Sequence, residues 1–129
     1  MKKLEQDIKE YLIERGWDRL KPGDIAKSIS IEAGELLENF QWRNPTLEEV
    51  KSDSKLMEEL KGELADILTY CLDMSVVLDI DTEAIIREKL EKIKKKYPAD
   101  LMKNESEVSY PGSENYWKIK NQYRNTKND

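Results

Sequence analysis

The 129-residue sequence contains no histidine and a single cysteine, and it has only 5 Gly and 4 Pro. These shortages exclude a disulfide framework, a zinc site of the usual Cys/His kind, and a Ser-His or Cys-His catalytic pair. Few helix-breaking residues together with 38% charged residues are typical of a helical protein. We therefore expect an all-α fold, and the length leaves room for one domain with a real core.

Positive charge is also scarce, because 22 Lys and Arg residues stand against 27 Asp and Glu residues and leave a formal net charge of -5. Proteins that bind the backbone of nucleic acids normally present a basic surface, so a nucleic-acid polymer is not an expected partner. A nucleotide could still bind if metal ions supplied the missing charge. No apolar run follows Lys2 and Lys3, so we expect neither a signal peptide nor a membrane span, and a cytoplasmic location.

The stretch from Ser30 to Trp42 is predicted to form most of a central helix that carries two stripes of side chains. One stripe is apolar and recurs every three or four residues, at Ile25, Ile29, Ala33, Leu36 and Phe40. The other contains Glu32 and Glu35. Because they are three residues apart, both carboxylates project to nearly the same side of the helix. Asp24 is the expected N-cap of this helix, which should end near Trp42.

A second long helix, expected from about Lys55 to Leu78, repeats this arrangement. Its inner apolar stripe consists of Leu60, Leu64, Ile67 and Cys71. Glu63 and Asp66 lie beside that stripe, again three residues apart. If the two apolar stripes pack together, four carboxylates converge where the helices meet. Oxygen-only ligands favour magnesium, with manganese as a substitute, over iron or zinc.

Acidic pairs three residues apart also arise by chance in a chain with 27 acidic residues, and we interpret Glu88 and Glu91 as such a pair on a solvated face. The repetition of the pattern on two consecutive helices favours a divalent-metal site. The alternative is a non-catalytic helical dimerisation or interaction module whose acidic faces are solvated or meet a basic partner.

Four to five helices should form a bundle that oligomerisation completes. Besides the two long helices, we expect helices from Lys2 to Arg15, from a capping box at Thr46 through Val50, and from Glu83 to Tyr97. From Leu64 onward the second long helix is apolar on nearly every side, which indicates burial against a second copy in a homodimer or tetramer.

The composition changes after Pro98. We expect an all-α domain over residues 1–98 and a tail over residues 99–129 that is rich in Lys, Asn, Ser and Glu. The tail also carries Tyr116, Trp117, Ile119 and Tyr123, which is more aromatic than an ordinary flexible linker. A short helix at 113–124 is therefore predicted to dock on a neighbouring surface.

Three motifs in order carry a family resemblance: Glu32-Ala-Gly-Glu35 continuing to Phe40-Gln-Trp42, then Glu63-Leu-Ala-Asp66, then Lys96-Tyr97-Pro98. They resemble the MazG-like all-α nucleotide pyrophosphohydrolases, and within these the short, dCTP-preferring branch is the most similar. The resemblance implies a magnesium-dependent enzyme that cuts a nucleoside triphosphate between the α and β phosphates. The products would be a monophosphate and pyrophosphate, with dCTP or a modified pyrimidine nucleotide as the expected substrate.

The resemblance also implies roles for individual residues. The metal would be held by Glu32, Glu35, Glu63 and Asp66. Glu35, and with it Glu32, is the candidate for water activation.

Other candidates would contact the nucleotide. Lys89, Lys96 and Tyr97 are candidate substrate contacts near the phosphates, although a solvated helix end explains the lysines equally well. Trp17 and Trp42 could stack on the base, which is worth about 1–3 kcal/mol, although Trp42 could equally be a core residue at a helix end. The chain departs from the branch at Leu20, where members often carry His, and at Ile93, where they carry Asn.

Overall fold

The structure is a computed structural model that describes residues 1–103 and 114–126. Within these ranges the regular structure consists of helices and contains no strand, which confirms the predicted all-α fold. None of the described helices combines the length and apolar character needed to cross a bilayer. The chain divides into two compact units, Met1–Thr82 and Glu83–Asp129. The expected division into residues 1–98 and 99–129 stays a prediction.

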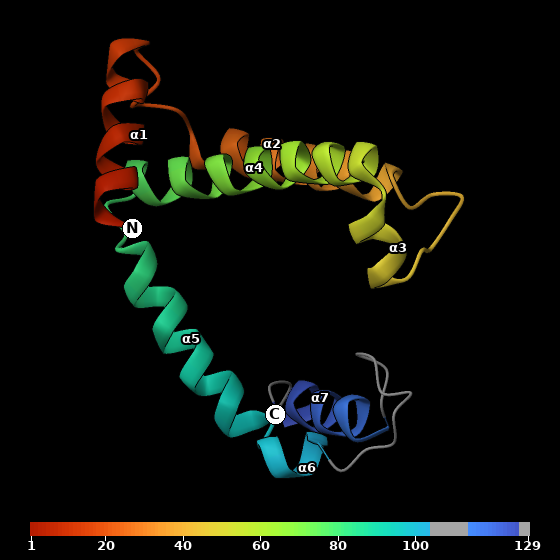
Figure 1. Ribbon diagram of the computed structural model, residues 1–129. Helices are drawn as coiled ribbons and strands as arrows, with labels where there is room; N and C mark the ends of the chain where they lie inside the picture. The colour runs from red at the N-terminus through yellow and green to blue at the C-terminus, as the bar shows by residue number, and fades with distance from the viewer. Residues whose placement is uncertain (104–113, 127–129) are drawn as a thin grey trace. The chain divides into compact units, whose positions relative to one another are not determined.

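The first unit is built on a pair of antiparallel helices. It contains α1 (Lys2–Glu14), α2 (Pro22–Glu38), α3 (Leu47–Ser52) and α4 (Ser54–Val77). Helices α2 and α4 lie side by side and run in opposite directions, while α1 packs across the C-terminal end of α4 (Figure 1). This pairing brings together the two segments that carry the predicted carboxylate stripes.

Helix α2 begins and ends earlier than the sequence predicts. Its N-cap is Lys21 and its first residue is Pro22, so the prediction of Asp24 as N-cap is wrong. Proline suits the first helical position because its φ is already helical and its missing N–H would have no partner there. The helix ends at Glu38. The Asn39 side chain donates to the Glu35 carbonyl at 3.3 Å, which gives a hydrogen-bond partner to one of the last carbonyls of the helix.

Side-chain caps define the starts of α3 and α4, and the first of them is the predicted capping box at Thr46. The Thr46 hydroxyl accepts from the Glu49 N–H at 3.2 Å, and the Glu49 carboxylate accepts from the Thr46 N–H at 2.7 Å. The Asp53 carboxylate accepts from the Leu56 N–H at 2.9 Å and caps α4. These contacts fix where α4 begins and hence the position of its carboxylates.

The buried core of the first unit is small. One cluster joins α1 to the end of α4 and consists of Ile8, Leu12 and Leu72, with Val76 and Val77 packed against it. The predicted α2 stripe is buried at Ile25, half-buried at Ile29, Leu36 and Phe40, and exposed at Ala33. In the α4 stripe Leu64 is 50% exposed, because it lies nearly opposite Asp66 on the helix, on the same side as Leu68.

The second unit contains α5 (Thr82–Lys96), which begins at the unit boundary, α6 (Ala99–Lys103) and α7 (Glu114–Thr126). Pro98 ends α5 as expected, but α6 follows it at once and was not predicted. Helix α7 packs on α6, and its Tyr116 stacks on Tyr97 with ring centroids 5.2 Å apart. The predicted docking role of the tail on a neighbouring surface stays a prediction.

Candidate active site

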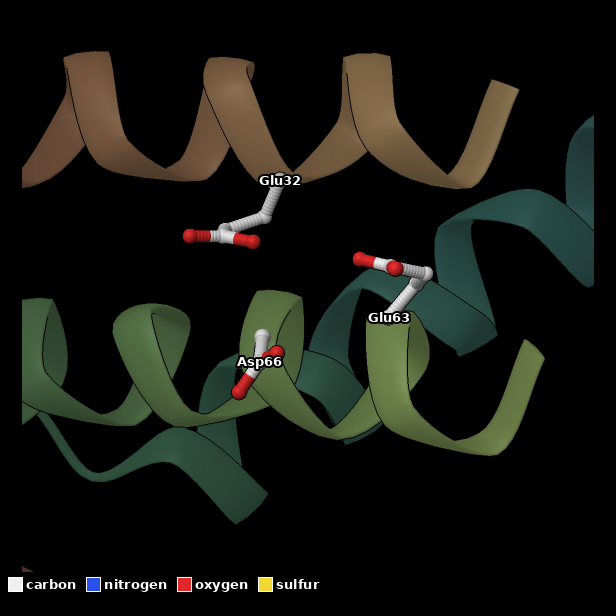
Figure 2. Close-up of side chains that lie close together, drawn as sticks. All are labelled: Glu32, Glu63 and Asp66. Carbon is white, nitrogen blue, oxygen red and sulfur yellow. The ribbon is translucent and has the colours of Figure 1, made fainter. Parts of the chain in front are cut away.

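Three carboxylates meet between α2 and α4. Glu32 extends from α2, and Glu63 and Asp66 extend from α4, so that one carboxylate oxygen from each lies within 4.8 Å of the others (Figure 2). Glu32 and Glu63 are half-buried, whereas Asp66 is exposed. The separation is short enough for these oxygens to share one divalent cation.

The fourth predicted carboxylate, Glu35, belongs to the same cluster. Burial raises the pKa of the Glu32 carboxyl, and the charges of Glu35 and Asp66 raise it further. Burial also raises the pKa of Glu63, followed by the charges of Glu35 and Asp66. Glu35 is within side-chain hydrogen-bonding reach of both Glu32 and Glu63. Concentrated negative charge of this kind is relieved by a bound cation.

Glu38 is a member of the cluster that the sequence analysis did not single out. Its charge contributes to the raised pKa of Glu63. A signal was present, because Glu32, Glu35 and Glu38 continue one spacing of three along the same helix face. We define the carboxylate cluster as Glu32, Glu35, Glu38, Glu63 and Asp66.

The donor set suits a hard divalent cation. Every ligand that the cluster offers is a carboxylate oxygen, the type that Mg²⁺ and Mn²⁺ prefer. Among the residues that the structure describes, no Lys or Arg forms an ion pair with any member of the cluster. The described Lys and Arg residues therefore leave this charge uncompensated, and the residues fit a metal site.

A cavity of about 340 Å³ adjoins the cluster and shares Asp66 with it. We call it the aromatic cavity. Its walls are formed by Tyr11, Trp17, Leu20, Ser28, Asp66, Thr69, Tyr70 and Asp73. The rings of Tyr11 and Trp17 meet edge to face with centroids 5.8 Å apart, which fixes the indole at the cavity wall.

The structure thus places one of the two predicted tryptophans beside the carboxylates. Leu20, one of the departures from the family pattern, lines the same cavity. Trp42 is different: its side chain is 89% exposed, beyond the end of α2, so it is not a core residue of this chain. Tyr70 and Asp73 were missed by the sequence analysis, although each lies on the face of α4 that carries Asp66, four and seven residues further on.

The remaining predicted substrate contacts lie in the second unit. Lys89 and Lys96 line a separate cavity of about 400 Å³ together with Lys92, Lys95 and Arg124. The Lys96 ammonium lies 5.2 Å from the ring centroid of Tyr97 and 4.5 Å from that of Tyr123. Glu88 pairs with Lys92 and Glu91 with Lys94 on exposed positions of α5, which is consistent with a solvated face.

Comparison with known proteins places the chain in a family. Residues 27–110 match the MazG-like family. The chain is 28% identical to mouse dCTP pyrophosphatase 1 over 94 residues, which cover 71% of this chain and 55% of that protein. Human dCTP pyrophosphatase 1 is 27% identical over 99 residues, with 75% of this chain and 58% of the relative covered. The chain therefore spans little more than half the length of these curated relatives.

A solved structure is similar along a larger share of its own length. It is the crystal structure of a pyrophosphatase from Archaeoglobus fulgidus DSM 4304, with 37% sequence identity and a TM-score of 0.66. The match covers 76% of this chain and 92% of that one. On the family match over most of its length, this chain belongs to the MazG-like family.

Proposed function

We propose that the chain is a nucleotide pyrophosphatase that hydrolyses a nucleoside triphosphate between the α and β phosphates, with dCTP or a modified pyrimidine nucleotide as substrate. The observation that carries this proposal is the convergence of the carboxylate cluster beside the aromatic cavity. The activities for which the relatives are named, dCTP pyrophosphatase in mouse and human and pyrophosphatase in Archaeoglobus fulgidus, support the same reaction class.

Glu32, Glu35, Glu63 and Asp66 would hold the metal, for which Mg²⁺ is proposed and Mn²⁺ is a substitute. A bound divalent cation would offset the charge of both the carboxylates and the polyphosphate and favour ionisation of the attacking water. Without such a cation, a triphosphate would meet a cluster of its own sign and be repelled.

The chain's own groups would position the reactants and move the proton. Glu35, which lies beside Glu32 and Glu63 in the cluster, would accept a proton from the attacking water, and Glu32 would orient that water. Trp17 and Tyr70 in the aromatic cavity would stack on the base.

Lys89, Lys96 and Tyr97 belong to the second unit, and their contact with the substrate stays a prediction. Trp42 lies beyond the C-terminal end of α2, more than ten residues, or about 15 Å of helix, from Ser28 in the cavity wall, so its stacking on the base stays a prediction.

A substrate panel tests the proposal. The common and several modified nucleoside triphosphates are incubated with the protein and Mg²⁺, and pyrophosphate is detected. We expect release with a pyrimidine deoxynucleoside triphosphate and loss of that release in Glu63→Gln. The matched control Glu91→Gln removes a charge from the exposed face of α5 and should retain activity. An interaction module would release pyrophosphate from none of them.

A further inference from the structure

Asp73 is a buried acid that the proposed metal chemistry does not use. Its side chain lies on α4 and is only 4% exposed. One of its carboxyl oxygens is buried without a hydrogen-bond partner among the residues that the structure describes. Burial raises the pKa of this carboxyl. Buried polar atoms are nearly always paired, because an unpaired one costs free energy, so this oxygen is available to accept a hydrogen bond from a bound molecule.

The position of Asp73 indicates where that partner would come from. Asp73 lines the aromatic cavity together with Trp17 and Tyr70. It lies seven residues after Asp66, which is two helical turns, or about 10 Å along α4. This offset leaves room for a sugar between phosphates held at the carboxylate cluster and a base stacked in the cavity. The terminal torsion of aspartate is broad, so either oxygen can turn toward such a base.

We propose that Asp73 is a specificity-determining residue that accepts a hydrogen bond from the exocyclic amino group of the base and thereby selects cytosine over uracil and thymine. This inference rests on the proposed function and goes beyond it. Cytosine presents an N–H donor at its 4-position, whereas uracil and thymine present a carbonyl acceptor. A carboxyl oxygen that has no donor in the protein gains one from cytosine, while the carbonyl oxygen of uracil or thymine leaves it unpaired.

The test varies the protein and the base together. Wild type and Asp73→Leu, which keeps a branched side chain without an acceptor, are assayed with dCTP and with the corresponding deoxynucleoside triphosphate of 2-pyrimidinone, which lacks only the amino group. We expect kcat/KM of the wild type to fall about tenfold or more when the amino group is removed, the effect of one lost specific contact. Asp73→Leu should process both substrates within about threefold of each other, because the two changes remove the same contact.

Asp73→Asn provides the conservative control. Its amide retains an acceptor oxygen and adds N–H donors. This variant should keep the response to loss of the amino group and gain activity on dTTP, whose carbonyl can accept from the amide. A residue that acts only by supporting the fold would change activity on all substrates by the same factor.

The outcomes separate the two proposals. If the wild type releases pyrophosphate equally well with and without the amino group, only the role of Asp73 is contradicted, and the proposed function stands. The same holds if loss of the amino group lowers kcat/KM equally in wild type and Asp73→Leu. A wild type that releases pyrophosphate from no triphosphate contradicts the proposed function itself, and the role of Asp73 with it. If circular dichroism shows that Asp73→Leu does not fold, two measurements still test the role of Asp73. They are the response of the wild type to loss of the amino group and the activity of Asp73→Asn on dTTP.

Discussion

The side chains of the carboxylate cluster destabilise the metal-free fold. Glu32 and Glu63 have raised pKa values because folding removes solvent from them and brings Glu35 close. The same closeness prepares the cluster for a cation, which is a usual trade between stability and function. Removing one charge from the cluster should therefore raise the stability of the metal-free protein and lower that of the metal-bound protein.

Glu35→Gln tests this trade because it keeps the shape of the side chain and removes its charge. Without metal the variant should melt at a higher temperature than the wild type, since repulsion within the cluster falls. Magnesium should reverse the ranking, because a ligand bound only by the folded state stabilises it, by about 2.7 kcal/mol at a hundredfold excess over Kd. Melting curves of both proteins in chelator and in millimolar magnesium give the comparison.

Glu91→Gln is the matched control for this measurement. Glu91 is exposed on α5, where it pairs with Lys94 at 2.7 Å. Loss of an exposed ion pair changes stability by roughly 0–1 kcal/mol, and the change should be the same with and without magnesium. If Glu35→Gln behaves like this control and neither protein responds to magnesium, the carboxylates form an ordinary solvated surface.

The pH dependence of stability follows from the direction of the two shifts. Below the ordinary glutamate pKa of 4.5 both carboxyls are protonated in either state and contribute nothing. As pH rises above this value, the unfolded chain releases protons first, so the metal-free fold loses stability until the raised pKa values are passed. We expect the wild type in chelator to lose more stability between about pH 4.5 and 7 than the Glu32→Gln/Glu63→Gln variant. Parallel curves in thermal melts would contradict this.

The convergence of the carboxylates could be predicted from the sequence, because two pairs at a spacing of three each flanked an apolar stripe. Glu38 and Asp73 could not be selected in the same way. Several acidic residues share those helix faces, and which of them face a neighbour depends on how α2 and α4 pack side by side. Spacing along one helix does not contain that information.

At the scale of elements, α4 depends on a cap at its first turn. Asp53 accepts from the Leu56 N–H at 2.9 Å, and its other oxygen lies 3.7 Å from the Arg43 guanidinium. Asp53→Ala should lower the free energy of unfolding by about 1 kcal/mol, whereas Asp53→Asn and Asp53→Ser retain a capping acceptor and should cost less. Chemical denaturation of the three variants checks this order. Equal losses for all three would show that the cap does not stabilise α4.

The elements themselves were largely predictable, and the exceptions have local causes. The capping box at Thr46 and the break at Pro98 were predicted because they rest on neighbouring residues. The start of α2 was misplaced because Asp24 is a good cap, yet Pro22 is better placed as the first helical residue. Helix α6 spans only Ala99–Lys103, too short for a periodic pattern to indicate it.

At the scale of the whole molecule, a single copy leaves much apolar surface exposed. Side chains from α4 and the following turn are exposed by 50% at Leu64, 53% at Leu68, 46% at Leu78 and 36% at Ile80. Soluble monomers rarely expose a large apolar patch. We therefore propose that the protein is a homodimer or a tetramer, in which a second copy covers this surface.

Leu68→Glu tests that assembly by placing a charge on the exposed face of α4. Light scattering should show an oligomer for the wild type at micromolar concentration and a lower mass for the variant, because burying an unpaired charge is costly. Lys55→Glu makes a charge change at an exposed position in the first turn of α4 and should leave the mass unchanged. A wild type that is a stable monomer would contradict the proposed assembly.

The most direct test of the central claim is the identity of the phosphorus products. The protein is incubated with magnesium and dCTP, and the reaction is followed by phosphorus NMR. Cleavage between the α and β phosphates predicts monophosphate and pyrophosphate in equal amounts from the first time point, with no diphosphate. Stepwise appearance of orthophosphate and dCDP, or an unchanged dCTP spectrum, would contradict the assignment of this chain as a nucleotide pyrophosphatase.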